Sequence, residues 1–262
     1  MHTSPFLLEV YFMNHYDDLA IIILAAGKGT RMKSDLAKVL HKVAGKSMVN
    51  HVIECARHIC PDHIHVVVGH QAEQVKERVT QRFQVRFSIQ EHLLGTGDAV
   101  KSALPHIDKH IDKVLVLCGD VPLIQKDTLK SLIDGHRNSH AAVTVLATDV
   151  ENPTGYGRLI LDSDGRLLCI REEADASTEE KAIKTVNTGI YCFDKAFLKA
   201  AVQSLQPDNN QEEYYLTDVI KIAKENDHPV SVVAMDDPRQ VIGVNTLEEL
   251  GIAERLIRHL RG

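Results

Sequence analysis

The chain has 262 residues, of which 44% are hydrophobic and 25% charged, and a formal net charge of −6 at pH 7. These ordinary globular values predict one large or two small domains and exclude extensive disorder. No apolar stretch reaches the length of a membrane span. The negative charge gives no electrostatic reason to expect nucleic acid or an acidic membrane as partner.

The first residues are expected to lie outside the folded domain. We predict an N-terminal extension over residues 1–19, for which disorder is one of the expected states. The sequence leaves open whether translation starts at Met1 or at Met13. The extension has no basic n-region and no small-residue cleavage site, so no secretory signal is predicted. The five cysteines are an odd number without a C-x-x-C pair, which is typical of reduced thiols. These features predict a cytoplasmic protein.

A buried strand is predicted at Ile21–Leu24, and a glycine-rich segment with two cations follows it directly. The segment reads Leu24-Ala25-Ala26-Gly27-Lys28-Gly29-Thr30-Arg31-Met32, and Lys38 comes shortly after it. Small residues let backbone amides approach an anion, and the cationic side chains add positive charge beside them. The segment therefore predicts a polyphosphate site and a nucleotide-dependent enzyme.

Two commoner phosphate loops do not fit this segment. The dinucleotide fingerprint G-x-G-x-x-G needs a third glycine where Met32 stands. The Walker loop needs a first glycine where Leu40 stands, although Gly45-Lys46-Ser47 supplies its end. A tight structural turn without any ligand is the remaining alternative for the glycine-rich loop alone.

Strands alternate with helices through the first half of the chain. Strands are predicted at Ile21–Leu24, Ile64–Val68, Val85–Ile89, Val114–Leu117 and Ala142–Ala147, and helices at Ser47–Ile59, Ala72–Arg82, Gly97–Ala103 and Lys126–Arg137. This alternation is typical of a mostly parallel sheet covered on both faces. Ser47 and Thr96 are predicted as helix N-caps.

After about residue 150 the pattern changes to short strands with tight turns. Strands are predicted at Arg158–Leu161, Leu167–Arg171, Thr185–Phe193 and Val230–Ala234, with a turn at Asp164-Gly165 and a final helix at Leu247–Arg261. We expect a nucleotide-binding part over about residues 20–150, a smaller inserted lobe over about 151–235, and a C-terminal helix over 247–262.

Two later loops carry residues suited to binding. Gly95-Thr96-Gly97 permits close backbone approach to a flat ring or a phosphate. The strand Val114–Leu117 delivers Asp120 to the carboxyl edge of the sheet, where open α/β sheets bind ligands. A carboxylate opposite a phosphate loop predicts a Mg²⁺ ligand, because Mg²⁺ is held by a few hard oxygens and substrate phosphates. A turn cap is the alternative for Asp120, and Cys118 beside it is not predicted to be a nucleophile.

Taken in order, these motifs resemble the bacterial UDP-N-acetylglucosamine pyrophosphorylases, which are N-acetylglucosamine-1-phosphate uridylyltransferases. The resemblance starts at residues 24–41 and continues through Leu94–Gly97, Gly119–Leu123, Asn152–Arg158, Asn187–Gly189, Glu213–Asp218 and Gly243–Asn245. It implies an α/β, Rossmann-like nucleotidyltransferase fold of the GT-A-like kind, with a mostly parallel sheet and a smaller inserted sugar-binding lobe. The nucleotidyltransferase domain would span residues 20–246.

The resemblance implies transfer of UMP from UTP to N-acetylglucosamine 1-phosphate. The products would be pyrophosphate and UDP-N-acetylglucosamine, a precursor of peptidoglycan and lipopolysaccharide. The implied cofactor is Mg²⁺, and the implied partners are these two substrates, with no nucleic acid and no membrane. Family members continue into a β-helix acetyltransferase that also holds a trimer together. Because the chain stops at Gly262, we expect neither acetyltransferase activity nor such a trimer.

The resemblance also implies a role for each matching position. Catalysis is implied for Arg31, Lys38 and Asp120, and metal binding for Asp120 and Asn245. The nucleotide would be bound by Leu24, Ala25, Ala26, Gly27, Gly29, Gln90, Gly95 and Thr96, of which the last three would read uracil. The sugar would be bound by Gly157, Glu172, Asn187, Tyr215 and Thr217. The chain differs from the usual family pattern at Leu93 and Asp98, which replace glutamine and histidine, and at Ala37, which replaces proline.

Two other functions stay open. One is a related pyrophosphorylase for another sugar 1-phosphate, which would use the same phosphate-binding residues. The other is a non-catalytic nucleotide-sugar binding protein. The second is disfavoured, because a binding protein has less need of metal ligands and of cations that stabilise a transition state.

Overall fold

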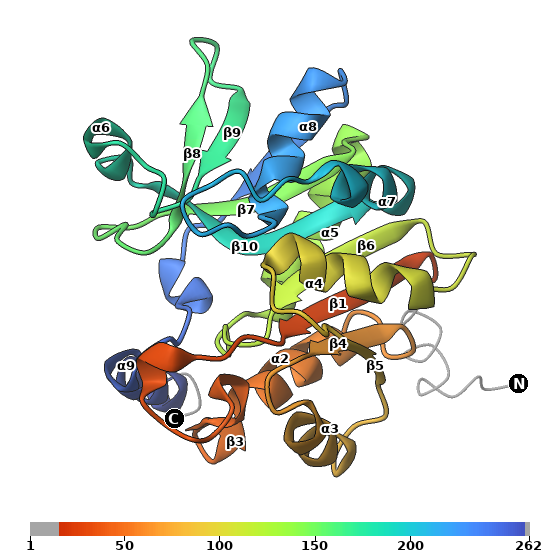
Figure 1. Cartoon of the computed structure of the whole chain (residues 1–262), viewed down its shortest axis with the longest axis vertical. Coiled ribbons are helices and arrows are strands. Elements are labelled where there is room, and N and C mark those ends of the chain that lie inside the picture. Colours follow the sequence, from red (N-terminus) through yellow and green to blue (C-terminus); the bar gives the residue numbers. More distant parts are fainter. Residues whose placement is uncertain (1–15, 260–262) are drawn as a thin grey trace, which may run out of the picture.

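The computed structural model describes residues 16–259. Its centre is a nine-stranded sheet whose main path runs β11-β7-β10-β6-β1-β4-β5 (Figure 1). These strands are β1 (Leu19–Ala25), β4 (Ile64–Val68), β5 (Arg86–Ile89), β6 (Lys113–Cys118), β7 (Val143–Asp149), β10 (Thr185–Asp194) and β11 (Val230–Ala234). Only β10 is antiparallel to its two neighbours on this path. This is the mostly parallel, Rossmann-like sheet that the sequence predicts.

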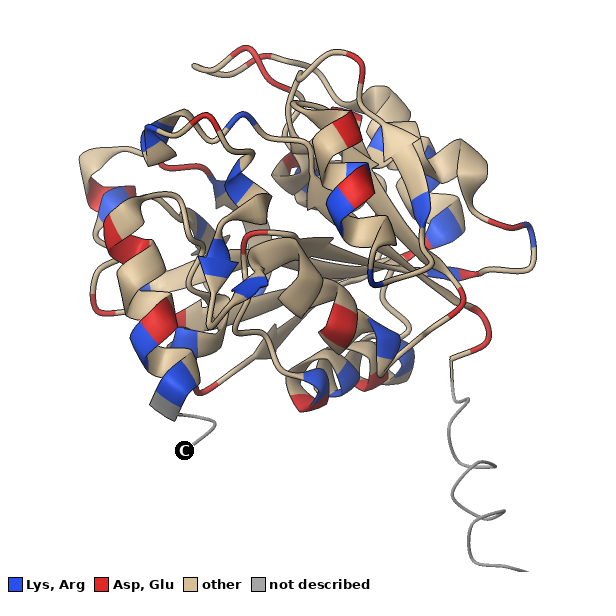
Figure 2. Ribbon diagram, turned by 90° about the horizontal axis from the view of Figure 1, so that it is seen from below, with Lys and Arg blue, Asp and Glu red and all other residues tan. Residues whose placement is uncertain are grey.

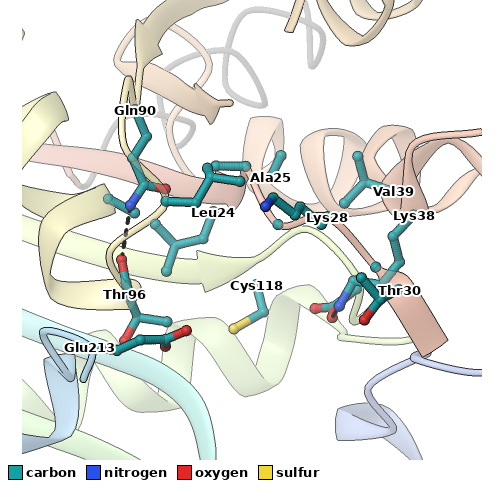
Figure 3. Close-up of a pocket in the computed structure, with 17 residues that line it drawn as sticks. Leu24, Ala25, Lys28, Thr30, Lys38, Val39, Gln90, Thr96, Cys118 and Glu213 are labelled. Carbon is teal, nitrogen blue, oxygen red and sulfur yellow. Dashed lines mark hydrogen bonds and ion pairs between the residues drawn. The ribbon is translucent and has the colours of Figure 1, made fainter. Parts of the chain in front are cut away.

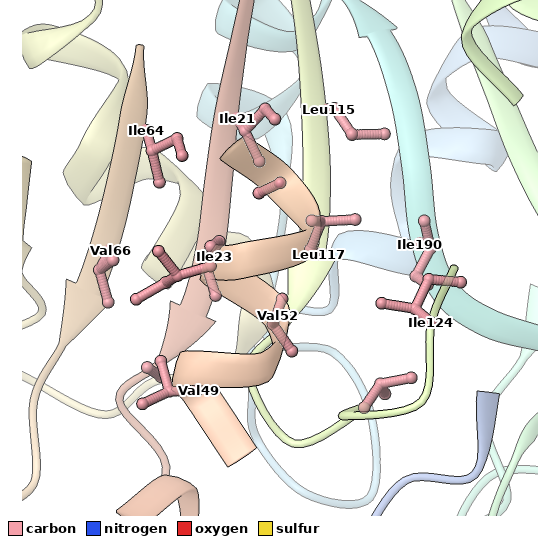
Figure 4. Close-up of a cluster of buried hydrophobic side chains, with 14 of the residues drawn as sticks. Ile21, Ile23, Val49, Val52, Ile64, Val66, Leu115, Leu117, Ile124 and Ile190 are labelled. Carbon is pink, nitrogen blue, oxygen red and sulfur yellow. The ribbon is translucent and has the colours of Figure 1, made fainter. Parts of the chain in front are cut away.

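Helices cover both faces of the sheet because side chains of β1 alternate between two cores. Ile21 and Ile23 belong to the core under α2, α3 and α5, whereas Ala20 and Ile22 belong to the core under α4, α7 and α8. The bounds are α2 (Met48–Arg57), α3 (Ala72–Thr80), α4 (Thr96–Ala103), α5 (Lys126–Ser139), α7 (Lys195–Ser204) and α8 (Val219–Glu225). Figure 4 shows α2 lying across the first face. Burial on both sides explains why the strand is a continuous apolar run.

A small lobe branches from the main sheet at β10. It consists of β8 (Gly157–Leu161), β9 (Leu167–Arg171) and the short helix α6 (Thr178–Lys181). Strand β8 pairs with β10 where Gly157 lies opposite Asn187, and β9 pairs with β8. The predicted lobe over 151–235 is too large, because β10, α7, α8 and β11 belong to the main layers. A bulge between Asn187 and Tyr191 lets one long strand serve both units, so the strand pattern alone does not mark their boundary.

The folded domain begins earlier than the predicted boundary at residue 20. Leu19 starts β1 and is fully buried, and the backbone oxygen of Asp18 accepts hydrogen bonds from the amides of Asp112 and Lys113. The hydroxyl of Tyr16 donates to Asp134. These contacts attach residues 16–19 to the sheet and to α5. The predictions for residues 1–15, including the alternative starts, lie outside the described residues.

The helix α9 (Leu247–His259) occupies the place of the predicted C-terminal helix. It packs on a hairpin formed by β2 (Lys42–Val43) and β3 (Lys46–Ser47), near the glycine-rich loop (Figure 1). A separate hydrophobic cluster joins the two, with Val43 from the hairpin, Val244 before the helix and Ala253 within it. The last described segment of the chain is thereby held against the first third.

Acidic and basic residues are interspersed over the helices and loops of the described chain (Figure 2). None of the helices within residues 16–259 is long and apolar enough to cross a membrane. Positive charge that could hold an anionic ligand is therefore expected in particular loops and not over one whole face of the protein.

His65 makes the core sensitive to acid. It is fully buried in β4, and neither ring nitrogen has a hydrogen-bond partner among the described residues. Burial lowers the pKa of His65 from 6.5 to about 4; Arg86, His106 and His63 act in the same direction and Asp108 opposes them. The unfolded chain therefore binds a proton at His65 below about pH 6.5, whereas the folded chain does not accept it until about pH 4. The free energy of unfolding therefore decreases as the pH drops through this window.

We expect this residue alone to lower the free energy of unfolding by about 2 kcal/mol between pH 7 and pH 5. Urea unfolding of the wild type and of His65→Leu at both pH values measures the effect, because the leucine variant lacks the titrating ring. His92→Leu, at an exposed position, is the matched control. The same pH dependence in the wild type and in His65→Leu would contradict the prediction.

Candidate active site

A cleft of about 480 Å³ opens at the carboxyl ends of β1 and β6. Its lining includes Leu24 to Thr30, Lys38, Val39, Gln90, Leu93, Gly95, Thr96, Ala99, Cys118, Asp120 and Glu213. Figure 3 shows Gln90 and Thr96 at one end, Thr30 and Lys38 at the other, and Lys28 between them. The cleft therefore has one end suited to a flat polar ring and one end suited to phosphates.

Two glycines shape the loop that follows β1. Gly27 lines the cleft, and a Cβ atom there would meet no atom within 4 Å, so its missing side chain leaves room for a ligand. Gly29 has a φ of +63°, and a Cβ atom there would lie 2.5 Å from Cβ of Lys38. Only glycine allows both this conformation and this approach. The loop can therefore pass directly over Lys38.

Four predicted site residues meet at the end of the cleft that is suited to phosphates. The ammonium group of Lys38 forms an ion pair with Oδ2 of Asp120 and donates to Oδ1 of Asn245 at 3.0 Å. The same Asn245 oxygen accepts a hydrogen bond from Nη2 of Arg31, also at 3.0 Å. Both side chains of the Lys38–Asp120 pair are mostly buried, with exposed fractions of 16% and 17%. Burial strengthens such contacts relative to contacts in water.

Backbone contacts hold Asp120 and Asn245 in place. The amide of Gly119 donates to Leu24 O at 2.8 Å, which ties the end of β6 to the end of β1. The amide of Val244 donates to Asp120 O at 2.9 Å, and this bond brings the segment with Asn245 to the cleft. Nδ2 of Asn245 donates to Gly243 O at 3.2 Å, so the amide oxygen faces Lys38. Ala37 has a φ of −51°, which lies within the range that a proline at this position would impose.

The oxygens of Asp120 and Asn245 fit a shared cation. Both contact the same ammonium nitrogen, so one small cation could bridge them. Among residues 16–259 no group of three or more His, Cys, Asp and Glu side chains could hold a metal ion. A site with two protein oxygens suits Mg²⁺, which takes its other ligands from water and substrate phosphates.

The other end of the cleft is built around Gln90, which is only 5% exposed. Its Nε2 donates to Gly95 O at 3.0 Å and to Oδ2 of Asp98 at 2.8 Å. Gly95 has a φ of +107°, and a Cβ atom there would lie 2.7 Å from Tyr214 O. The predicted N-cap role of Thr96 is wrong: Gly95 is the N-cap, and the Thr96 hydroxyl instead accepts from the amide of Leu216 at 3.0 Å.

Most of the predicted sugar-binding residues form a second group beside the cleft. Asn187 lies opposite Gly157 in the strand pairing, and a Cβ atom on Gly157 would lie 3.3 Å from Oε2 of Glu172. The hydroxyl of Thr217 donates to Oε1 of Glu172 at 3.1 Å. Burial raises the pKa of Glu172, and the bond from Thr217 partly offsets the rise. The hydroxyl of Tyr215, two residues before Thr217, donates to Gln211 at 2.7 Å.

Strand β10 joins the group of predicted sugar-binding residues to the nucleotide cleft. Asn187 accepts from the amide of Gly189 at 3.0 Å, and the Gly189 oxygen is 3.4 Å from Sγ of Cys118, which lines the cleft. Burial raises the pKa of Cys118 to about 12, so the thiol stays protonated near neutral pH and is a poor nucleophile. This agrees with the expectation that Cys118 carries no covalent chemistry.

Glu213 was not predicted as a site residue, and Asp98 was noted only as a departure from the usual family pattern. Glu213 lines the cleft, although its motif was assigned to the sugar side, and burial raises its pKa. Asp98 contacts Gln90 eight residues away, across a loop and the first turn of α4. The spacing of Asp98 from Gln90 carried no signal, because the loop between them has no regular period.

The fold and the cleft define a nucleotidyltransferase. The family described as MobA-like NTP transferase domain matches residues 21–189 of this chain. A Bacillus anthracis protein described as a glucose-1-phosphate thymidylyltransferase has the same fold, with a TM-score of 0.71 over 92% of this chain and 95% of that protein, at 19% sequence identity.

More similar relatives carry the name bifunctional protein GlmU. The protein from Geobacter metallireducens is 50% identical over 92% of this chain and 51% of its own length. The protein from Desulfotalea psychrophila is 43% identical over 95% of this chain and 73% of its own length. The chain therefore belongs to the GlmU family of nucleotidyltransferases. It spans about half the length of several of the curated relatives that it matches.

Proposed function

We propose that the protein transfers UMP from UTP to N-acetylglucosamine 1-phosphate and releases pyrophosphate. The observation that carries this proposal is the meeting of Arg31, Lys38, Asp120 and Asn245 at one end of a cleft whose other end holds Gln90. A nucleoside triphosphate would lie along the cleft with its base at Gln90. The sugar phosphate would bind beside the cleft, at the group of residues that includes Glu172 and Asn187.

The proposed chemistry is an in-line displacement. A phosphate oxygen of the sugar phosphate attacks the α-phosphorus of UTP, the new P–O bond forms, and the bond to the β-phosphate oxygen breaks with its electron pair leaving on pyrophosphate. That phosphate oxygen is already ionised at neutral pH, so no general base and no covalent enzyme intermediate are needed. Catalysis then depends on positioning and on neutralising charge, to which Lys38 and Arg31 contribute.

Asp120 and Asn245 would hold Mg²⁺, and the bound ion would supply positive charge at the phosphates. The chain's own residues would supply the other contacts: the glycine-rich loop offers backbone amides to the phosphates, and Lys38 offers its ammonium group at the same end of the cleft. A cytoplasmic location belongs to the same proposal. The absence of nucleic-acid, membrane and trimer partners stays a prediction.

Glu172 is proposed to accept hydrogen bonds from the sugar. Glu172→Gln is expected to raise the KM for N-acetylglucosamine 1-phosphate by about 10- to 100-fold, the effect of losing a charged hydrogen-bond partner. The KM for UTP should change less than about twofold, because Glu172 does not line the nucleotide cleft. Steady-state kinetics with each substrate varied in turn measures both values. A rise in the KM for UTP instead would contradict the assignment.

A pyrophosphate-release assay tests the proposed function directly. We expect release when UTP, Mg²⁺ and N-acetylglucosamine 1-phosphate are all present, and none when any one of them is omitted. Faster release with N-acetylgalactosamine 1-phosphate or glucose 1-phosphate would favour the related pyrophosphorylase. Binding of UDP-N-acetylglucosamine without any release would favour the non-catalytic alternative.

A further inference from the structure

The side-chain amide of Gln90 is held by two acceptors. Its nitrogen donates to Gly95 O at 3.0 Å and to Oδ2 of Asp98 at 2.8 Å. An amide nitrogen has two hydrogens, so these bonds use both of them. A backbone carbonyl and a carboxylate accept but do not donate. The nitrogen and oxygen of this amide therefore cannot exchange places without bringing two acceptors together.

The fixed orientation leaves only the oxygen of Gln90 for a ligand. The backbone of Gln90 is held by a 2.8 Å bond from its amide to Val68 O, and the side chain lines the cleft. Figure 3 shows the amide nitrogen on the side of Thr96 and the amide oxygen on the side of Leu24. A base placed beside Leu24 would meet an acceptor that cannot become a donor.

We propose that Asp98 is a positioning residue for base selection, acting through Gln90. The inference rests on the proposed function, because it concerns which nucleoside triphosphate that cleft accepts. Uracil and thymine carry an N3–H donor on the edge where cytosine carries an N3 acceptor. The fixed oxygen of Gln90 pairs with the donor and repels the acceptor, so the cleft selects uracil and thymine over cytosine.

Asp98 is needed because Gly95 alone does not fix the amide. The last torsion of a glutamine side chain is broad, so an amide with a single acceptor can turn. With Asp98 removed, one N–H of Gln90 would lose its partner and could turn toward N3 of cytosine. Discrimination against cytosine should then fall, while uracil and thymine, which share the same edge, should be affected equally.

The test compares kcat/KM for UTP, CTP and dTTP in the wild type, Asp98→Ala and Asp98→Asn. We expect Asp98→Ala to lower the UTP:CTP ratio about tenfold and to leave the UTP:dTTP ratio within about twofold. Asp98→Asn keeps an acceptor oxygen and should retain the UTP:CTP ratio within about threefold. Lys101→Ala, at an exposed position on the same helix, is the matched control.

An unchanged UTP:CTP ratio in Asp98→Ala would overturn the inference, and so would an equal loss with all three nucleotides, which indicates a structural role. Turnover of no nucleotide by the wild type would instead remove the proposed function. In that case the relative affinities for UMP and CMP, measured by calorimetry on the same four proteins, still decide the role of Asp98. A UMP:CMP preference that falls about tenfold in Asp98→Ala supports it, and an unchanged preference overturns it.

Discussion

Replacement of Lys38 by alanine is expected to lower turnover by about 10²–10³, the usual effect of losing one preorganised electrostatic contact in an active site. Its ammonium group lies between Asp120 and Asn245 at the phosphate end of the cleft. The KM for UTP should rise much less than kcat falls, because the charge matters most when negative charge moves onto pyrophosphate.

The measurement is steady-state pyrophosphate release at saturating UTP. Lys130→Ala removes a lysine from an exposed position on α5 and is the control for loss of charge alone. Thermal unfolding of both variants shows whether the fold is kept. A Lys38→Ala enzyme with more than half of normal turnover would remove Lys38 from the mechanism.

Asp120→Asn is expected to lower activity at a fixed, low Mg²⁺ concentration by at least about 10²-fold, since even outer-shell changes cost 10- to 100-fold in metal affinity. Asparagine keeps the shape and one oxygen but loses the negative charge. Higher Mg²⁺ should therefore recover part of the activity. Added Mg²⁺ should recover none of the activity lost in Lys38→Ala.

Titration of activity against Mg²⁺ separates these two outcomes. Asp127→Asn makes the same substitution at an exposed position after β6 and should leave the titration unchanged. A midpoint for Mg²⁺ in Asp120→Asn equal to that of the wild type would show that Asp120 does not hold the ion.

The sheet was predictable because its strands are long apolar runs. The predicted strands Ile64–Val68, Leu167–Arg171 and Val230–Ala234 coincide with β4, β9 and β11. Helices α7 and α8 were not predicted. They pack on the second face of the sheet, and such tertiary packing supplies most of the stability of short helices.

The site was only partly predictable. Asp120 follows from its place after a buried strand, and the glycine-rich loop follows from its composition. The contact of Lys38 with Asn245 joins residues 207 positions apart, and only the resemblance suggested that they belong together. The contact between Gln90 and Asp98 was not predicted, because it depends on how one loop returns to meet the start of α4.

The docking of α9 has a consequence for how the protein is made. The cluster of Val43, Val244 and Ala253, together with the bond from the Ala44 amide to Glu254, attaches the end of the described chain to the hairpin that follows Lys38. A nascent polypeptide that has left the ribosome only as far as β11 contains all the strands of the described residues, yet it lacks Asn245, which lies beyond β11. Catalytic competence should therefore arise only after the segment that follows β11 has emerged, when the sheet is already in place.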